Sequence, residues 1–251
     1  IDSGQYVNFL QSSTTATVLN RVVGGAASQI AGTLTSNGFV FLINPAGIHF
    51  ASSAVVEVAG LVASSLDISN EAFLARSYQF IQPDGLPPAA VVNRGSLSTT
   101  EPGGVIALLG GAVSNEGVIT ARLGTVALAS GSKTTMSFEP DGQIQVVVDE
   151  PTTAAVVGPD GEVTEGAVNA GTIVAEGGTV LVTASALSGV FDCVVNQTGI
   201  IEADSIVEHE GRIFLSGAGG PVRSVGSLRA TNGQITVTAS DDLAVGGEAL
   251  A

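Results

Sequence analysis

A short repeat built on glycine and aliphatic residues constrains the fold of this chain more than any other feature. Each copy reads Gly-x-Φ-x-(Ala/Thr), a short gap, and then Gly-x-Φ-x-Φ, where Φ is an aliphatic residue. Successive copies lie about 20 to 30 residues apart, apart from one long interruption, and this is the spacing of a solenoid. The copies begin at Gly95, Gly117, Gly171, Gly199 and Gly226, with a looser copy at Gly32.

Alternation with a period of two predicts strands with one buried face, and the mostly polar residues between the aliphatic ones are expected to face water. Aromatic residues make up only 4% of the chain, so small aliphatic side chains must fill repeated thin layers. No stretch keeps a period of 3.6 residues for three turns, which excludes a helical solenoid. We predict an all-β parallel β-helix. Its internal column contains Ile119, Ile173, Ile201 and Leu228.

The long interruption of the repeat, at about residues 133–166, carries two strong turn signals. Pro140-Asp141-Gly142 and Pro159-Asp160-Gly161 are each flanked by strand-like runs, which predicts extra-helical hairpins. Turn chemistry explains Asp141 and Asp160 better than a cation site does. We interpret residues 1–251 as a single domain, with an N-terminal cap in residues 1–92 and the coils in residues 93–251.

An asparagine precedes several copies of the repeat, and two structures remain open for this set. Side-chain amides stacked at one corner of successive coils would form a ladder of hydrogen bonds, whereas isolated turn asparagines would adopt the left-handed conformation. The residues are Asn93, Asn115, Asn169 and Asn196. Further upstream, Ser69–Arg76 is compatible with a short helical turn capped by Ser69 or Asn70.

Charge and composition exclude several classes of function. The formal net charge is −15 and Lys133 is the single lysine, so no basic stripe for nucleic acid or anionic lipid exists. No apolar run reaches the roughly 18 residues of a spanning helix. One cysteine, Cys193, excludes an internal disulfide framework and is expected to be a small buried filler. Without a signal peptide or an initial methionine, the chain is expected to be a processed or trimmed fragment.

The titratable residues do not form a catalytic pattern. Alternation places His49 opposite Ile48, so it is expected to point outward, and His209 lies in a polar stretch. The acidic pair Asp241-Asp242 is expected to be a solvated corner, and no zinc-type spacing occurs. We assign no catalytic, cofactor-binding or metal residue and predict that the chain is not an enzyme. The alternative is a β-helical carbohydrate-active enzyme, a lyase or hydrolase, which needs carboxylates and a basic residue in one groove.

A strand-to-turn segment is the most informative local motif. The apolar run from Phe39 leads directly into Asn44-Pro45-Ala46-Gly47, and apolar residues resume at Ile48. Asn at the first position, Pro at the second and Gly at the fourth is typical of a type I turn. The Asn side chain can also bond to the backbone two residues later.

This segment resembles the Asn-Pro-Asn-Gly-Ile motif of exoproteins secreted by the two-partner pathway, the filamentous-haemagglutinin family with its haemagglutination activity domain. The matching residues are Asn44, Pro45, Gly47 and Ile48 here, and Asn20, Arg21 and Val22 in the family's earlier box. Ala46 stands in place of the family's second Asn. The likeness covers most of the chain and is strongest before residue 80.

The resemblance implies a right-handed β-helix that acts as the secretion-recognition and folding-nucleation module of a large adhesin-type virulence protein. It implies recognition in the periplasm by an outer-membrane β-barrel transporter with periplasmic recognition domains, and then a secreted or cell-surface location in a Gram-negative bacterium. Host-cell binding is expected of a portion outside these residues, with glycan binding by the domain itself as a weaker alternative. Asn44 and Pro45 are expected either to contact the transporter or only to shape a turn.

Overall fold

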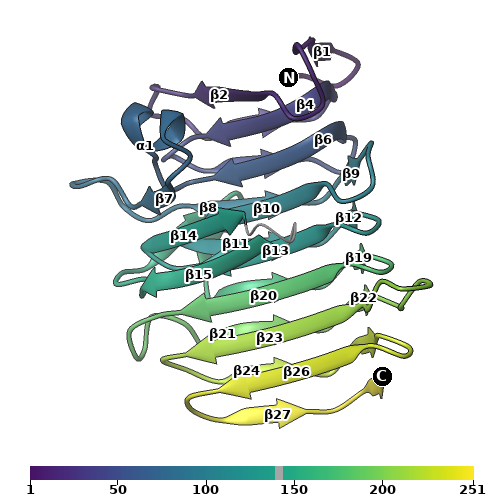
Figure 1. The fold of residues 1–251 in the computed structure, drawn as a ribbon. Coiled ribbons are helices and arrows are strands. Elements are labelled where there is room, and N and C mark those ends of the chain that lie inside the picture. The colour runs from purple at the N-terminus through teal and green to yellow at the C-terminus, as the bar shows by residue number, and fades with distance from the viewer. Residues whose placement is uncertain (139–143) are drawn as a thin grey trace.

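The computed structural model describes residues 1–138 and 144–251, which form a stack of β-coils with the two termini at opposite ends (Figure 1). Each regular coil passes through three strands, and each strand pairs in parallel with its equivalents in the neighbouring coils. The predicted parallel β-helix is confirmed. Among the described residues, no helix has the length and apolar character needed to cross a bilayer.

Two of the three faces belong to one 15-stranded sheet, because the long strands β4 and β6 extend across both faces. Its strands are β1 (Tyr6–Phe9), β2 (Thr17–Arg21), β4 (Thr33–Ile43), β6 (Val55–Ser64), β9 (Ser96–Thr99), β10 (Val105–Gly110), β12 (Val118–Thr120), β13 (Thr125–Ser130), β19 (Thr172–Val174), β20 (Thr179–Ser185), β22 (Ile200–Glu202), β23 (Arg212–Ala218), β25 (Ser227–Arg229), β26 (Gln234–Ala239) and β28 (Glu248–Leu250).

The third face is an eight-stranded parallel sheet. It consists of β3 (Ser28–Ile30), β5 (Ile48–Phe50), β8 (Ala90–Asn93), β11 (Ala112–Asn115), β18 (Glu165–Asn169), β21 (Cys193–Gln197), β24 (Val222–Ser224) and β27 (Leu243–Val245). The parallel pairing of β5 with β8 and of β6 with β9 continues across residue 92. The pairing does not test the predicted division into a cap (residues 1–92) and coils (residues 93–251), which stays a prediction.

The interior of the helix is a column of aliphatic side chains, as the repeat predicts. Ile119 faces Ile173, Ile173 faces Ile201, and Ile201 faces Leu228 in consecutive parallel pairs. All four side chains are at most 2% exposed. Each coil therefore gains its apolar burial by stacking on the coil before it.

Stacked glycines let the backbones of successive coils approach closely at one corner. A Cβ added at any of these positions would overlap the carbonyl oxygen of the equivalent glycine in the preceding coil. The glycines are Gly117, Gly171, Gly199 and Gly226. Their regular place in the repeat thus reflects close backbone approach, and none of the four has a positive φ.

The asparagine ladder exists, with one change of membership. Asn93 Nδ2 donates to Asn115 Oδ1 at 2.8 Å, and Asn115 Nδ2 donates to Asn169 Oδ1 at 2.8 Å. The next acceptor is Gln197 Oε1, also at 2.8 Å. The prediction for Asn196 is wrong: its side chain donates to Glu165 instead. None of the ladder residues adopts a positive φ, which rules out the isolated-turn alternative for them.

The extra-helical hairpins are confirmed, and one of them builds a second core. Strands β14 (Lys133–Phe138) and β15 (Ile144–Glu150) pair with each other and with β7 (Tyr78–Ile81) in an antiparallel sheet. The turn predicted at Pro140-Asp141-Gly142 lies outside the described residues. The second hairpin joins β16 (Val156–Gly158) to β17 (Gly161–Val163).

The second core lies between this three-stranded sheet and the outer side of the β-helix, beside β10 and β13 (Figure 1). Outward-facing residues such as Val105, Ala107 and Ala127 are buried there. Alternation with Val126 and Leu128 predicts exposure for Ala127, whereas the repeat counted from Gly103 places Val105 and Ala107 on the interior side, and that register is wrong by one residue. Phe80 and Met136 of the added sheet pack against them. The short helix α1 (Asn70–Leu74) borders this core, and its N-cap is Ser69, as predicted.

Candidate functional site

The motif turn follows directly from the end of β4. The backbone N–H of Gly47 donates to the carbonyl oxygen of Asn44 at 2.9 Å, which closes the predicted β-turn. The N–H of Ala46 donates to Asn44 Oδ1 at 3.0 Å. Gly47 has a φ of +107°, a conformation that L side chains rarely adopt, so the turn requires glycine at this position. Ile48, the next residue, is fully buried in the core of the helix.

The Asn44 side chain is completely enclosed and fully hydrogen-bonded. Its Nδ2 donates to the carbonyl oxygen of Ala26 at 3.0 Å and to Ser28 Oγ at 2.9 Å. Because Oδ1 accepts the hydrogen bond from the Ala46 N–H, both polar atoms of the amide are bonded within the domain. Its exposed fraction is 0%, whereas Pro45 and Ala46 are half-buried. In the folded domain, Asn44 is therefore inaccessible to another protein.

The earlier box lies beside the turn. Strand β2 pairs in parallel with the end of β4, so that Arg21 is opposite Ile43, and the N–H of Val22 donates to the Ile43 carbonyl oxygen at 2.8 Å. Asn20 is half-buried, and its Nδ2 atom has no hydrogen-bond partner among the described residues. The structure thus brings together the two boxes that the sequence analysis singled out.

Arg21 connects β2 to the start of helix α1, a role that the sequence did not reveal. Its Nε donates to Asp67 Oδ1 at 2.7 Å and its Nη1 to Asn70 Oδ1 at 2.9 Å. A third hydrogen bond reaches the carbonyl oxygen of Ile68. Charge-assisted bonds of this kind are stronger than neutral ones, so Arg21 fixes the helix against the motif region. Asp67 lies 46 positions from Arg21 in the sequence, so no local sequence pattern indicates that the two side chains are in contact.

His49 points outward from the coil, as alternation predicts, but other segments cover it. The residue alternates with Ile48 and Phe50 as predicted, yet it is only 8% exposed. It lines a cleft of about 520 Å³ with Pro45, with the proline-rich loop after β7 and with the start of hairpin β16–β17. His49 Nδ1 lies 2.8 Å from Gln29 Nε2 and accepts its hydrogen bond, while Nε2 has no partner among the described residues.

Burial should make His49 the source of an acid sensitivity. Desolvation, and then the charge of Arg94, lowers the pKa of His49 below its ordinary value of 6.5, while Asp160 opposes the shift. The unfolded chain therefore takes up this proton first, and stability is lost as the pH falls below about 6.5. We expect His49→Gln to flatten the fall in the unfolding free energy between about pH 7 and about pH 5. Urea unfolding at several pH values measures this.

The exposed histidine is the control for that experiment. His209→Gln should leave the pH dependence unchanged, because His209 lies in an open loop. Equal pH profiles for the wild-type protein and the His49→Gln variant would contradict the assignment.

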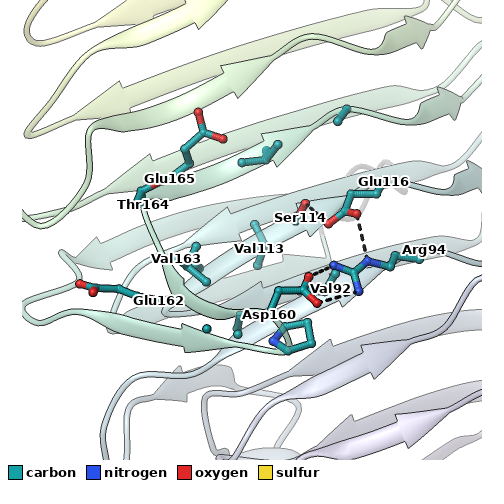
Figure 2. A pocket seen from close by; sticks show the side chains of 17 residues that line it. Val92, Arg94, Val113, Ser114, Glu116, Asp160, Glu162, Val163, Thr164 and Glu165 are labelled. Atoms are coloured by element: carbon teal, nitrogen blue, oxygen red, sulfur yellow. Dashed lines mark hydrogen bonds and ion pairs between the residues drawn. The ribbon is translucent and has the colours of Figure 1, made fainter.

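A slot of about 340 Å³ lies between hairpin β16–β17 and the outer side of β8 and β11 (Figure 2). Arg94, just after β8, points to Asp160 in the hairpin turn and to Glu116, with its Nε 3.0 Å from Glu116 Oε2 (Figure 2). Hydrogen bonds from Arg94 lower the pKa of Asp160. Asp160 therefore serves an ion pair that holds the hairpin on the sheet.

The other residues considered for chemistry are dispersed. Asp241 and Asp242 are exposed near the last strands, and Cys193 is buried at 3% exposure, as expected for a filler. Burial is the main cause that raises the pKa of the Cys193 thiol. Within residues 1–138 and 144–251, no group of three His, Cys, Asp or Glu side chains is placed to hold a metal ion.

The comparison with protein families decides the identity of the fold and of its motif region. A family model described as the TPS secretion domain matches residues 1–230. The chain belongs to the TPS secretion domain family. TPS denotes two-partner secretion, so the resemblance found in the motif residues is confirmed. Members of this family are secretion modules of exoproteins and not enzymes, and such exoproteins leave Gram-negative bacteria through the periplasm.

Three proteins that are similar to this chain come from Haemophilus influenzae. The chain is similar to the HMW1 secretion domain of that species, whose crystal structure matches 100% of this chain and 64% of its own with a TM-score of 0.81 and 34% identity. A heme/hemopexin-binding protein is 29% identical over 84% of this chain and 23% of its own length. Its counterpart in strain Rd is 32% identical over 66% of this chain and 19% of its own length. The chain thus spans about a fifth of these curated relatives.

Proposed function

We propose that this TPS domain directs the export of the exoprotein that carries it, by presenting residues 20–22 and 44–48 to an outer-membrane β-barrel transporter with periplasmic recognition domains. The observation that carries the proposal is the enclosure of Asn44. Its amide group is fully used inside the fold, so a transporter can reach it only before folding. Recognition therefore concerns the extended chain.

Folding then makes the motif residues inaccessible to the transporter. Once β2 pairs with β4 and the turn closes, Asn44 and Ile48 are buried and Arg21 is bound to Asp67. The same residues serve as a signal in the extended chain and as a structural element afterwards. Folding on the outer side removes the extended form from the equilibrium, and this favours outward movement by mass action.

We further propose that the domain nucleates the folding of coils that follow it in the exoprotein. Its last strands, β27 and β28, are exposed at every residue, and Leu243 and Leu250 are about half exposed. A further coil would cover these side chains and pair with these strands. Adhesion, binding of a host-cell surface and a role in virulence belong to other parts of the whole protein, of which this domain is a minor share in its relatives.

The experiment compares two variants that weaken the same turn. Asn44→Ala removes the motif amide and three hydrogen bonds, and should lower the unfolding free energy by roughly 3 kcal/mol. Ser28→Ala removes one of these bonds, at a cost of about 1 kcal/mol, and leaves the motif intact. In cells with the cognate transporter, we expect Asn44→Ala to reduce export of a fused passenger strongly and Ser28→Ala to leave it near the wild-type level.

Two outcomes would count against the proposal. Export that falls in Ser28→Ala in proportion to its lost stability would mean that the motif acts only as a turn. If the passenger were exported equally well without the TPS domain, the proposed secretion function of the domain would be wrong. Thermal unfolding of both purified variants separates stability from recognition.

A further inference from the structure

Most aromatic rings of this TPS domain gather in one place, although the chain has only nine Phe, two Tyr and no Trp. Six of them form a connected set of ring contacts on the outer side of the β-helix: Phe39, Phe41, Phe73, Tyr78, Phe80 and Phe138. The centroids of Phe39 and Phe138 are 6.4 Å apart, and those of Tyr78 and Phe138 are 5.4 Å apart. The second core buries some of these rings, whereas Phe138 remains partly exposed.

Four members of the set, Phe39, Phe41, Tyr78 and Phe138, line an open groove of about 530 Å³ between β2–β4 and β7–β14. Figure 1 shows α1 beside the ends of β2 and β4, with β7 below it. Phe138 is 44% exposed and Phe39 is half-buried. A side chain at Gly60 would overlap the ring of Phe39, so that glycine gives the ring its place on the sheet. This size and aromatic lining are typical of small-molecule sites.

One residue that lines the groove is a cation without an ion pair among the described residues. Arg76 is exposed, follows helix α1 and has a φ of +55°, which is uncommon for a residue with a side chain. It makes no ion pair with the described residues, although the chain carries a net charge of −15. Most other basic side chains here do form such pairs. A guanidinium that lines an aromatic groove and has no ion pair among the described residues matches an anionic ligand.

A hydroxyl group adds a second polar contact. Tyr78 is only 6% exposed and lines the same groove. Its hydroxyl forms no hydrogen bond with the described residues, so it is available to a ligand. Burial raises the pKa of Tyr78 and the nearby charge of Arg76 lowers it, in agreement with a neutral donor beside that cation.

We propose that this groove is a binding site for small aromatic carboxylates. The ring of the ligand packs against Phe39 and Phe138, and its carboxylate accepts hydrogen bonds from Arg76 and from the Tyr78 hydroxyl. A neutral aromatic compound would use only the rings, and a cation would be repelled by Arg76. This activity is separate from export, since none of the motif residues lines the groove.

The test uses two probes of equal shape and different charge, 3-phenylpropionate and 3-phenylpropanamide, titrated by NMR or calorimetry into the folded domain. We expect the carboxylate to bind about three- to tenfold more tightly than the amide. Arg76→Gln should abolish that difference and Tyr78→Phe should reduce it. Phe138→Ala should weaken both probes. The matched control is Arg223→Gln, which removes another exposed arginine that forms no ion pair with the described residues, on β24, and should keep the full difference.

Several results would overturn the proposal. They are the absence of binding of either probe at about 10 mM, equal affinity of the two probes for the wild-type domain, and a loss of discrimination in Arg223→Gln as large as in Arg76→Gln. Tighter binding of an acetylated Phe-Asp peptide amide than of 3-phenylpropionate would also overturn it, because the groove would then be a peptide site. Circular dichroism of each variant confirms that it is folded.

Discussion

Replacing Gly171 with alanine is expected to lower the unfolding free energy of the TPS domain by about 3 kcal/mol. The added Cβ would overlap the carbonyl oxygen of Gly117 in the preceding coil, and backbone atoms on both sides of the contact leave no flexible group to yield. The coils would have to separate locally and weaken the parallel pairing of β12 with β19. Urea unfolding followed by circular dichroism gives the shift of the midpoint at constant slope.

A second glycine provides the control for this substitution. Gly24 lies in an exposed loop, and a Cβ added there meets no atom within 4 Å. Gly24→Ala should therefore change the unfolding free energy by less than about 0.5 kcal/mol. Equal midpoints for the two variants would show that close approach of the coils is not what these glycines provide.

Replacing Asn115 with leucine is expected to lower the unfolding free energy by roughly 3 kcal/mol. The residue is 0% exposed and is in the middle of the ladder, where it accepts from Asn93 and donates to Asn169. The leucine would leave Asn169 Oδ1 without its ladder donor and Asn93 Nδ2 with only its longer bond of 3.4 Å to the Gly95 carbonyl oxygen. Thermal and urea unfolding of the purified variant measure the loss.

Asn196 is the matched control, because it lies near the ladder but outside it. Its side chain is bonded to Glu165, so Asn196→Ala should cost about 1 kcal/mol or less. Gln197→Ala, in contrast, should resemble Asn115→Leu in direction. A larger loss for Asn196→Ala than for Gln197→Ala would mean that the ladder does not end as described.

The regular part of the fold could be predicted because its signals are local and periodic. The spacing of Gly171 and Ile173 repeats that of Gly117 and Ile119, and the two pairs stack in register. The same spacing could have identified the fourth member of the ladder. Asn93, Asn115 and Asn169 each precede a repeat glycine by two positions, and Gln197, not Asn196, has that position before Gly199. The position relative to the repeat glycine, and not the residue type, therefore identifies a ladder member.

The parts that could not be predicted depend on contacts between distant segments. Alternation correctly placed His49 outside the coil, but it could not show that the loop after β7 and hairpin β16–β17 border the same cleft. The turn residues at 44–48 were evident, whereas the anchoring of Arg21 to Asp67 was not. The second core follows from the return of β14 to β7, which are about 50 residues apart in sequence and share no repeat signal.

The second core has a consequence for how the molecule loses its structure. It supports the coils from β4 to β13, whereas β26, β27 and β28 each pair with a single neighbouring strand and are largely open to water. Resistance to opening should therefore be greatest in the coils that the second core covers and lower toward both ends of the stack, where β1, β2 and β3 also pair with a single neighbour. Amide protons should therefore exchange with solvent faster in the end strands, such as β28 with Leu250, than in β10 and β13, and local opening should spare the doubly covered middle of the molecule.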